Sequence, residues 1–199
     1  MEILIINDCS TDNTLEVVKS IKDSRIRIIN NEVNVGAGMS RRIGTKKAKG
    51  EYTNFLDGDD YIDTDFIETL YNAAKKNNAD VVSSGIHFVD TDKIETYEED
   101  NQILIDDKLE KSCMVSRYLN NKLVRRTIWD KVDYSSRRYI EDTQTSYFVI
   151  WFVNKVVNLQ YVGYNYTNNP NSLCHTASPI KTLIYQALCA KDLCTFIAE

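Results

Sequence analysis

The segment that most constrains this chain is an apolar run that ends in three carboxylates. Residues 52–56 read Tyr-Thr-Asn-Phe-Leu, as in a buried strand, and Asp57, Asp59 and Asp60 follow at once. Unpaired charges are costly inside a sheet, whereas the carboxyl ends of strands in an α/β sheet open on a ligand-binding crevice. Carboxylates this close repel one another, and a divalent cation held by oxygen ligands is the usual remedy. The segment therefore predicts a strand leading into a metal site, with helix capping by aspartate as the alternative.

Strand and helix patterns alternate along the first half of the chain, which favours an α/β fold. We expect a mixed, mostly parallel central sheet flanked by helices. The length of 199 residues fits a single domain with a real core. The predicted strands cover residues 2–6, 25–29, 52–56 and 79–84, and the predicted helices cover residues 14–22, 39–49 (ended by Gly50) and 64–78.

The pattern changes after Gly85. Residues 87–107 are acidic and rich in threonine, which predicts a solvated excursion or a hairpin. Helices are expected at residues 110–120, 141–154 and 180–198, a helical turn at 125–129, and short strands at 122–124, 156–160 and 164–167.

Composition excludes several classes of protein. The formal net charge of −5 argues against a nucleic-acid binder, which would present a basic face. No apolar run approaches the ~20 residues that a membrane span needs. The five cysteines lack CxxC spacing, and the first residues lack a signal-peptide pattern. We therefore expect reduced thiols and a cytoplasmic protein.

Three carboxylate sites follow predicted strands or begin a predicted helix. Asp8 and the cluster at 57–60 fall on the same sheet edge if their strands are parallel. Arg41 and Arg42 could face the same crevice and contact phosphate or ribose, with a solvated helix face as the alternative. Glu141-Asp142 could supply a carboxylate that a metal does not consume, as a general base requires, and dipole complementation is the alternative.

Residues 5–14, Ile-Ile-Asn-Asp-Cys-Ser-Thr-Asp-Asn-Thr, resemble the VNDGSTDNS segment of family 2 inverting glycosyltransferases, which have the GT-A fold. Any one such motif is weak, but the chain carries an ordered set with consistent spacing along nearly its whole length. The further matches are residues 34–44 with N-x-G-x-x-x-A-R-N-x-G, 48–62 with AKGEYI-x-FLDSDDYI, 121–126 with NKLYRR, 139–142 with YxED, and 164–172 with YxYxxxxxS.

The resemblance implies a role for each matched residue. Asp8 and Arg41 would contact the nucleotide base. Asp57 would lie toward the ribose and phosphate, and Asp59 would bind a Mn²⁺ or Mg²⁺ ion that bridges the diphosphate. Asp142 would be the general base that deprotonates the acceptor hydroxyl.

The resemblance also implies the reaction and the division of labour. A sugar would pass with inversion from a nucleotide-diphosphate sugar, most simply a UDP-sugar, to a saccharide or lipid-linked acceptor in surface polysaccharide or glycan biosynthesis. Residues 1–199 would form one catalytic domain, with nucleotide binding in 1–85 and acceptor binding in 86–199. His175 would lie near the diphosphate, with an ordinary loop histidine as the alternative. Candidates for stacking on sugar rings, with core packing as the alternative, are Tyr118, Trp129, Tyr139, Tyr164 and Tyr166.

The chain departs from the family pattern in three places. Relatives begin some thirty residues earlier with a strand and a helix, so we expect an exposed sheet edge and weak nucleotide binding or self-association. Arg42 stands where asparagine is usual, and Gly58 separates the aspartates. The alternatives are an impaired, glycosyltransferase-like binding module and a nucleotidyltransferase, although the latter's glycine-rich basic signature is not found. Peripheral contact with the inner face of the membrane is a further alternative, without a basic helix face to support it.

Overall fold

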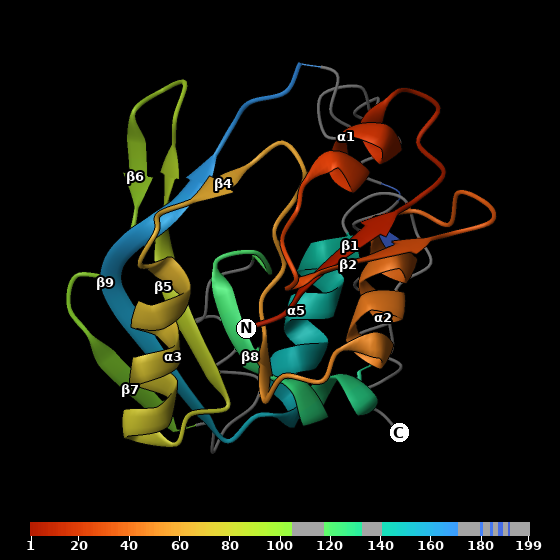
Figure 1. Cartoon of the computed structure of the whole chain (residues 1–199). Coiled ribbons are helices and arrows are strands. Elements are labelled where there is room, and N and C mark those ends of the chain that lie inside the picture. The colour runs from red at the N-terminus through yellow and green to blue at the C-terminus, as the bar shows by residue number, and fades with distance from the viewer. Residues whose placement is uncertain are drawn as a thin grey trace.

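The computed structural model describes residues 1–104, 118–132 and 141–170, with single positions at 180, 184, 187, 188 and 191. These residues form two sheets with helices against them, rather than the single sheet expected (Figure 1). Described positions from 180 to 191 are helical, whereas the expected helix at 110–120 lies mostly outside the described residues. Within the described residues, no helix combines the length and apolarity required to cross a membrane.

The first sheet has two parallel strands, β1 (Ile3–Asn7) and β2 (Ile26–Asn30), joined through α1 (Thr14–Ser20). This order confirms the predicted strand–helix–strand pattern. Helix α2 (Ala37–Lys47) follows and begins two residues earlier than predicted, directly after Gly36, whose φ of 83° reverses the chain. Gly50 does not end this helix, because Ala48 is already extended.

The second sheet has seven strands and a mixed topology. Its path runs β3 (Tyr52–Thr53), β8 (Lys122–Arg125), β5 (Val81–Phe88), β9 (Lys155–Tyr166) and β4 (Tyr61–Ile62). Strand β6 (Lys93–Glu95) pairs with β5, and β7 (Asn101–Leu104) pairs with β9. Only β5–β9 is parallel in this sheet as described, so the mixed sheet is confirmed and the predicted parallel excess is not.

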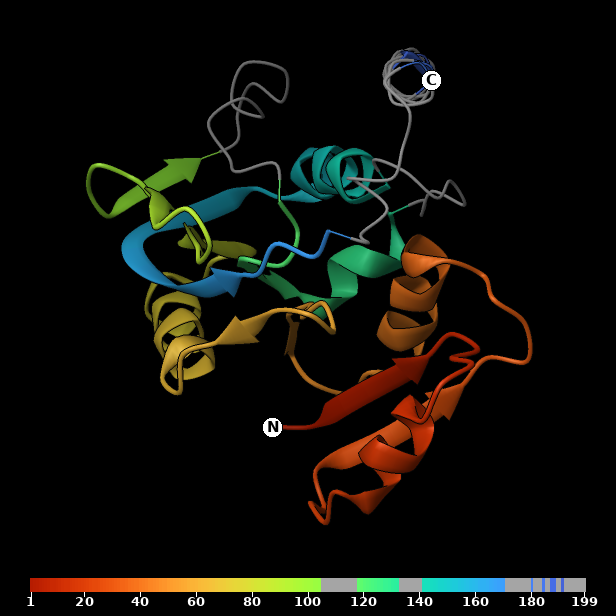
Figure 2. The same ribbon diagram turned by 90° about the horizontal axis from the view of Figure 1, so that it is seen from above.

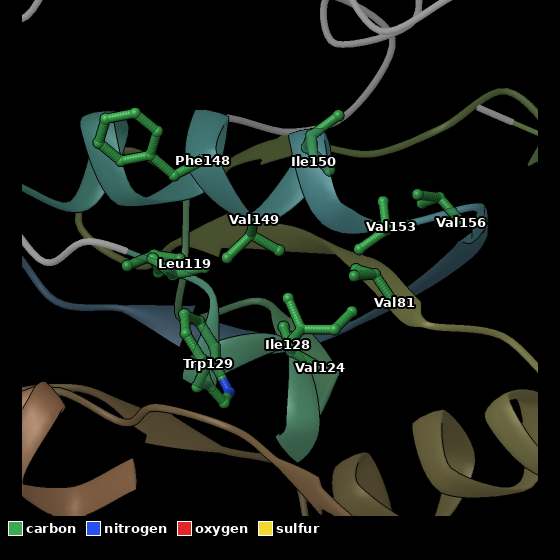
Figure 3. Close-up of a cluster of buried hydrophobic side chains, with 11 residues drawn as sticks. Val81, Leu119, Val124, Ile128, Trp129, Phe148, Val149, Ile150, Val153 and Val156 are labelled. Atoms are coloured by element: carbon green, nitrogen blue, oxygen red, sulfur yellow. The ribbon is translucent and has the colours of Figure 1, made fainter. Parts of the chain in front are cut away.

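The core lies on both faces of the second sheet. Successive residues of a strand point to opposite faces, so Val81 packs under α5 (Glu141–Phe152) while Val82 packs against α3 (Phe66–Asn77). Figure 3 shows Val149 of α5, and Val153 directly after this helix, directed toward this sheet and the 3₁₀-helix η1 (Arg126–Asp130). Neither cluster contains a residue of β1, α1 or β2.

Two strand predictions differ in extent from the structure. The strand expected at 52–56 stops at Thr53, because the Asn54 side chain donates to the carbonyls of Asn120 and Lys122 and the ladder ends there. The two strands expected at 156–160 and 164–167 form the single strand β9. The hairpin alternative for the acidic segment is confirmed by the pairing of β5 with β6.

Helix α2 joins the two sheets. It contacts β1 on one side and η1 and α5 on the other, and the view in Figure 2 places it between the β1–β2 pair and η1. At the start of β1, Glu2 Oε1 accepts hydrogen bonds from the amides of Lys49 and Gly50, just before β3. Helix α2 and the contacts of Glu2 thus connect the first sheet to the second.

Candidate functional site

Asp8 lies directly after β1 and fixes the loop that leads into α2. Its Oδ1 accepts hydrogen bonds from the Val35 amide at 2.9 Å and from Asn31 Nδ2 at 2.8 Å, and its Oδ2 accepts one from the Gly36 amide at 2.8 Å. Burial alone raises the pKa of Asp8, but these hydrogen bonds and one from Ser40 hold it below its ordinary value. The carboxylate thus shapes the predicted base pocket, while its contact with a base stays a prediction.

Cys9 adopts a backbone conformation that suits glycine. Its φ is 59°, in the left-handed region, and its Sγ donates to the Asn31 carbonyl at 3.2 Å. The family pattern quoted above has glycine at this position. The turn after β1 is therefore kept here at a cost in backbone strain.

Arg41 connects α2 with the acidic segment. Its Nη2 lies 2.9 Å from Asp57 Oδ1, and only 13% of its side chain is exposed. Its guanidinium also lies 5.9 Å from the centre of the Phe55 ring. Arg41 therefore faces the expected crevice, whereas Arg42 is exposed, as in the alternative of a solvated helix face.

The acidic segment itself is a turn. The Asp60 amide donates to the Asp57 carbonyl at 3.2 Å, which closes a four-residue turn with Gly58 and Asp59 at its tip. Asp59 is exposed, and its Oδ2 accepts a hydrogen bond from Asn169 Nδ2 at 3.2 Å. No atom lies within 4 Å of a Cβ built on Gly58, so this departure from the family pattern has no steric cause.

Asp60 contacts the end of β9 and the residue that follows it. It accepts hydrogen bonds from the Tyr164 hydroxyl at 2.5 Å and from the Thr167 amide at 2.9 Å. Burial raises the pKa of Asp60, and the charges of Asp57 and Asp59 add to that rise. The alternative that this segment caps the next helix is wrong, because β4 follows Asp60 and Asp65 is the residue that precedes α3.

The donor set fits a hard divalent cation. Asp57 and Asp59 offer carboxylate oxygens at a turn whose tip is exposed, and their charges help to raise the pKa of the neighbouring Asp60. Across 1–104, 118–132 and 141–170 no group of three or more His, Cys, Asp or Glu side chains is placed to hold a metal ion. Mg²⁺ and related ions are commonly held by one or two carboxylates with substrate phosphates completing the shell. The turn has the composition of such an open site.

The structure places the backbone of Asp142, the predicted general base, but not its side chain. Asp142 is the second residue of α5, which contacts α2, but its side chain lies outside the described residues, as does that of Glu141. His175 also lies outside them. The assignments of Asp142 and His175 therefore stay predictions.

The aromatic candidates divide between core and surface. Tyr164 and Trp129 are buried at 0% and 3% exposure, which excludes stacking of either ring on a sugar in this conformation. Tyr118 and Tyr166 are half-buried and flank Phe88, and Tyr139 lies outside the described residues. For Tyr164 and Trp129 the alternative of a ring packed in the core is therefore confirmed.

Two residues that support the acidic turn, Asn120 and Thr167, were not predicted as site residues from the sequence. Asn120 Nδ2 donates to the Tyr164 hydroxyl at 3.0 Å, and Thr167 Oγ1 donates to the Asp59 carbonyl. The partners are 44 positions apart along the chain in the first contact and 108 positions apart in the second. No local pattern signals such contacts, although Tyr164 was already part of a matched motif.

Comparison with known families agrees with this arrangement. The sequence model of the family described as "Glycosyl transferase family 2" matches residues 1–146, which include β1, the Arg41 helix and the acidic turn. The chain belongs to glycosyl transferase family 2. The resemblance stated from the motifs is therefore confirmed.

Relatives within glycosyl transferase family 2 match different shares of the chain. Glycosyltransferase GlyG of Streptococcus pneumoniae is 26% identical over 88% of this chain and 64% of its own length. The Escherichia coli protein named UDP-Glc:alpha-D-GlcNAc-diphosphoundecaprenol beta-1,3-glucosyltransferase WfaP is 40% identical over 47% of this chain and 32% of its own. The chain thus spans less than two thirds of the length of these relatives.

A solved structure shares the fold of this chain. S. aureus TarS in complex with UDP-GlcNAc superposes with a TM-score of 0.77 at 20% identity, covering 89% of this chain and 52% of that one. The likeness confirms the glycosyltransferase GT-A fold expected from the sequence.

Proposed function

We propose that this chain carries the donor-binding and catalytic part of a glycosyltransferase that uses a UDP-sugar. The observation that carries the proposal is the acidic turn, whose Asp57 pairs with Arg41 from α2 at 2.9 Å while Asp59 stays exposed. A diphosphate needs both cationic and cation-holding groups at one crevice, and this turn supplies them side by side. Residues 1–85 would bind the donor, and residues 86–199 would bind the acceptor.

The chain's own residues would share the work of an inverting displacement. Asp142 would take the proton from the acceptor hydroxyl as that oxygen bonds to the anomeric carbon. The bond between that carbon and the diphosphate would break, and its electron pair would leave with the UDP. Asp57 and Arg41 would orient the ribose and diphosphate, and Asp8 would keep the base pocket in shape through the loop before α2.

Asp59, with Asp57 beside it, would hold Mn²⁺ or Mg²⁺. Such an ion supplies electrostatic stabilisation to the departing diphosphate, whose negative charge grows in the transition state. Hard carboxylate oxygens at an open turn suit an ion that keeps positions for phosphate oxygens.

The class of acceptor follows from relatives. WfaP is named for glucosyl transfer to a diphosphoundecaprenol-linked sugar, and S. aureus TarP, 42% identical over 41% of this chain, is named as a poly(ribitol-phosphate) N-acetylglucosaminyltransferase. We therefore propose a saccharide or lipid-linked acceptor in the assembly of a surface polysaccharide or glycan. Such an acceptor would bring the protein to the cytoplasmic face of the membrane.

A calorimetric titration of UDP with and without Mn²⁺ tests the proposal. We expect binding to strengthen at least about tenfold with Mn²⁺ in the wild-type chain and to lose this dependence in Asp59→Ala. Asp142→Asn is expected to abolish sugar transfer while it changes UDP affinity less than about twofold.

The matched control is Asp130→Ala, which removes an exposed aspartate that pairs only weakly with Lys46 at 3.3 Å. It should bind UDP like the wild type. Absence of any Mn²⁺ effect in the wild-type chain would exclude the metal-dependent enzyme and leave the binding-module alternative. Transfer by Asp142→Asn at a wild-type rate would remove Asp142 from the role of base.

A further inference from the structure

The acidic turn is anchored to the end of β9 through its last residue, Asp60. Asp60 places one carboxylate oxygen 2.5 Å from the Tyr164 hydroxyl and the other 2.9 Å from the Thr167 amide. Since the Asp60 amide also closes the turn on Asp57, fixing Asp60 fixes the orientation of the turn. The end of β9 thus holds Asp60, and through Asp60 it holds the turn that carries Asp57 and Asp59.

Tyr164 is a rigid partner for this contact. Its side chain is fully buried, its ring packs edge-on against Phe66 at 6.2 Å, and Asn120 Nδ2 donates to its hydroxyl at 3.0 Å. Burial and the contact with Asp60 raise the pKa of Tyr164, so the hydroxyl keeps its proton and acts as the donor. A buried hydroxyl with both partners fixed can hold a loop in one position.

The segment after β9 adds a second attachment. Thr167 Oγ1 donates to the Asp59 carbonyl, and Asn169 Nδ2 lies 3.2 Å from Asp59 Oδ2. The Asn168 amide in turn donates to Asp90 Oδ2 at 2.8 Å, which ties this segment to the hairpin side of the sheet. The exposed aspartate therefore receives support from residues more than a hundred positions away.

We propose that Tyr164 is a positioning residue that acts through Asp60 to hold Asp57 and Asp59 where a cation and a diphosphate can bind between them. The inference rests on the proposed function for the ligand, whereas the hold on the turn itself does not depend on it. Groups that bind a metal or phosphate need partners that lock their orientation, and a loop supplies such locking only when it is tied to rigid elements.

The competing explanation is that Asp60 is itself a third cation ligand. Two variants separate the explanations, because asparagine keeps an oxygen that can accept from Tyr164 but loses the charge. A positioning role predicts that Asp60→Asn keeps more UDP–Mn²⁺ affinity than Asp60→Ala, by at least about fivefold. A ligand role predicts equal losses in the two variants, and that result would overturn the proposal.

The direct test compares Tyr164→Phe with Tyr161→Phe. Tyr161 lies on the same strand, contacts the same Phe66 ring and donates to Asp65 at 2.6 Å, so the control loses a matching hydroxyl–carboxylate bond away from the turn. Hydrogen exchange of peptides covering residues 56–62 is measured first, without ligand. Exchange of the turn should accelerate at least about tenfold in Tyr164→Phe and stay within about twofold of wild type in Tyr161→Phe.

The affinity for UDP with Mn²⁺ is the second readout, and both variants are first shown to unfold cooperatively. We expect Tyr164→Phe to weaken it at least about fivefold and Tyr161→Phe to leave it unchanged. Wild-type exchange in Tyr164→Phe, or faster exchange with unaltered affinity, would overturn the positioning role. If wild-type chain does not bind UDP with Mn²⁺, the proposed function fails, while the exchange measurement still decides whether Tyr164 holds the turn.

Discussion

The β1–α1–β2 unit and the seven-stranded sheet differ in how they are stabilised. Both hydrophobic clusters belong to the larger sheet and its helices, and residues such as Val81, Val82 and Phe66 are fully buried there. In the smaller unit no residue of α1 is buried, all five residues of β1 are only half-buried, and Val17 and Ile21 are more than half exposed. The β1–β2 ladder, the contact of α2 with β1 and the hydrogen bonds around Asp8, rather than a buried core, hold this unit in shape.

The difference shows where the site obtains its rigidity. The acidic turn is fixed by Tyr164, which belongs to the core, while Asp8 and its loop are fixed by hydrogen bonds at the edge of the unit. Strand β1 pairs only with β2 among the described strands, so its other edge is open. We therefore expect Asp8 and its loop to be the softer part of the site, and the acidic turn to be the more rigid part.

The largest expected difference concerns side-chain truncation. Phe66→Ala should lower the free energy of unfolding by about 4 kcal/mol, because it leaves a cavity in a closed core. Ile28→Ala, on half-buried β2, should cost about 1 kcal/mol. Denaturant unfolding of both variants measures the contrast, and equal losses would mean that the smaller unit is as well packed as the core.

A smaller effect is expected at Asp8. The pKa of Asp8 is lower in the folded protein than in the unfolded chain, where it is about 4. The Asp8 carboxylate therefore stabilises the folded protein at a pH above the unfolded pKa, and this contribution is lost as the pH falls through the folded pKa. Asp8→Asn should therefore cost about 2 kcal/mol at pH 7 and progressively less toward pH 3. Unfolding is followed over that range with Asp130→Asn as the control. A penalty that does not change with pH would contradict the role given to this carboxylate.

The smallest effect is expected at Cys9, where strain opposes the loop geometry. Cys9→Gly relieves a positive φ, and Cys9→Ala removes the same thiol but keeps the Cβ. The glycine variant should be more stable than the alanine variant by about 1 kcal/mol. Thermal unfolding of the pair measures this difference, and an alanine variant of equal or greater stability would show that the turn is not strained.

The first strands and helices and the family could be predicted because they depend on local sequence patterns. The periodicity of residues 2–29 gave β1, α1 and β2, and ordered motifs gave the family and the neighbourhood of Arg41 and the acidic turn. Contacts between distant positions were not predictable, since no local signal tells that Asn54 ends β3 by bonding to Asn120, or that Tyr164 reaches Asp60. The predicted parallel excess failed for the same reason, because β8 and β9 come from the irregular second half.

We expect the β1–α1–β2 unit and the acidic turn to form one donor site. Hydrogen exchange with and without UDP and Mn²⁺ tests it most directly. We predict slower exchange both in residues 7–10 and 31–41 and in residues 56–62, with no change in the β5–β6 hairpin at 86–95. Protection confined to one of the two regions, or absent from both, would contradict it.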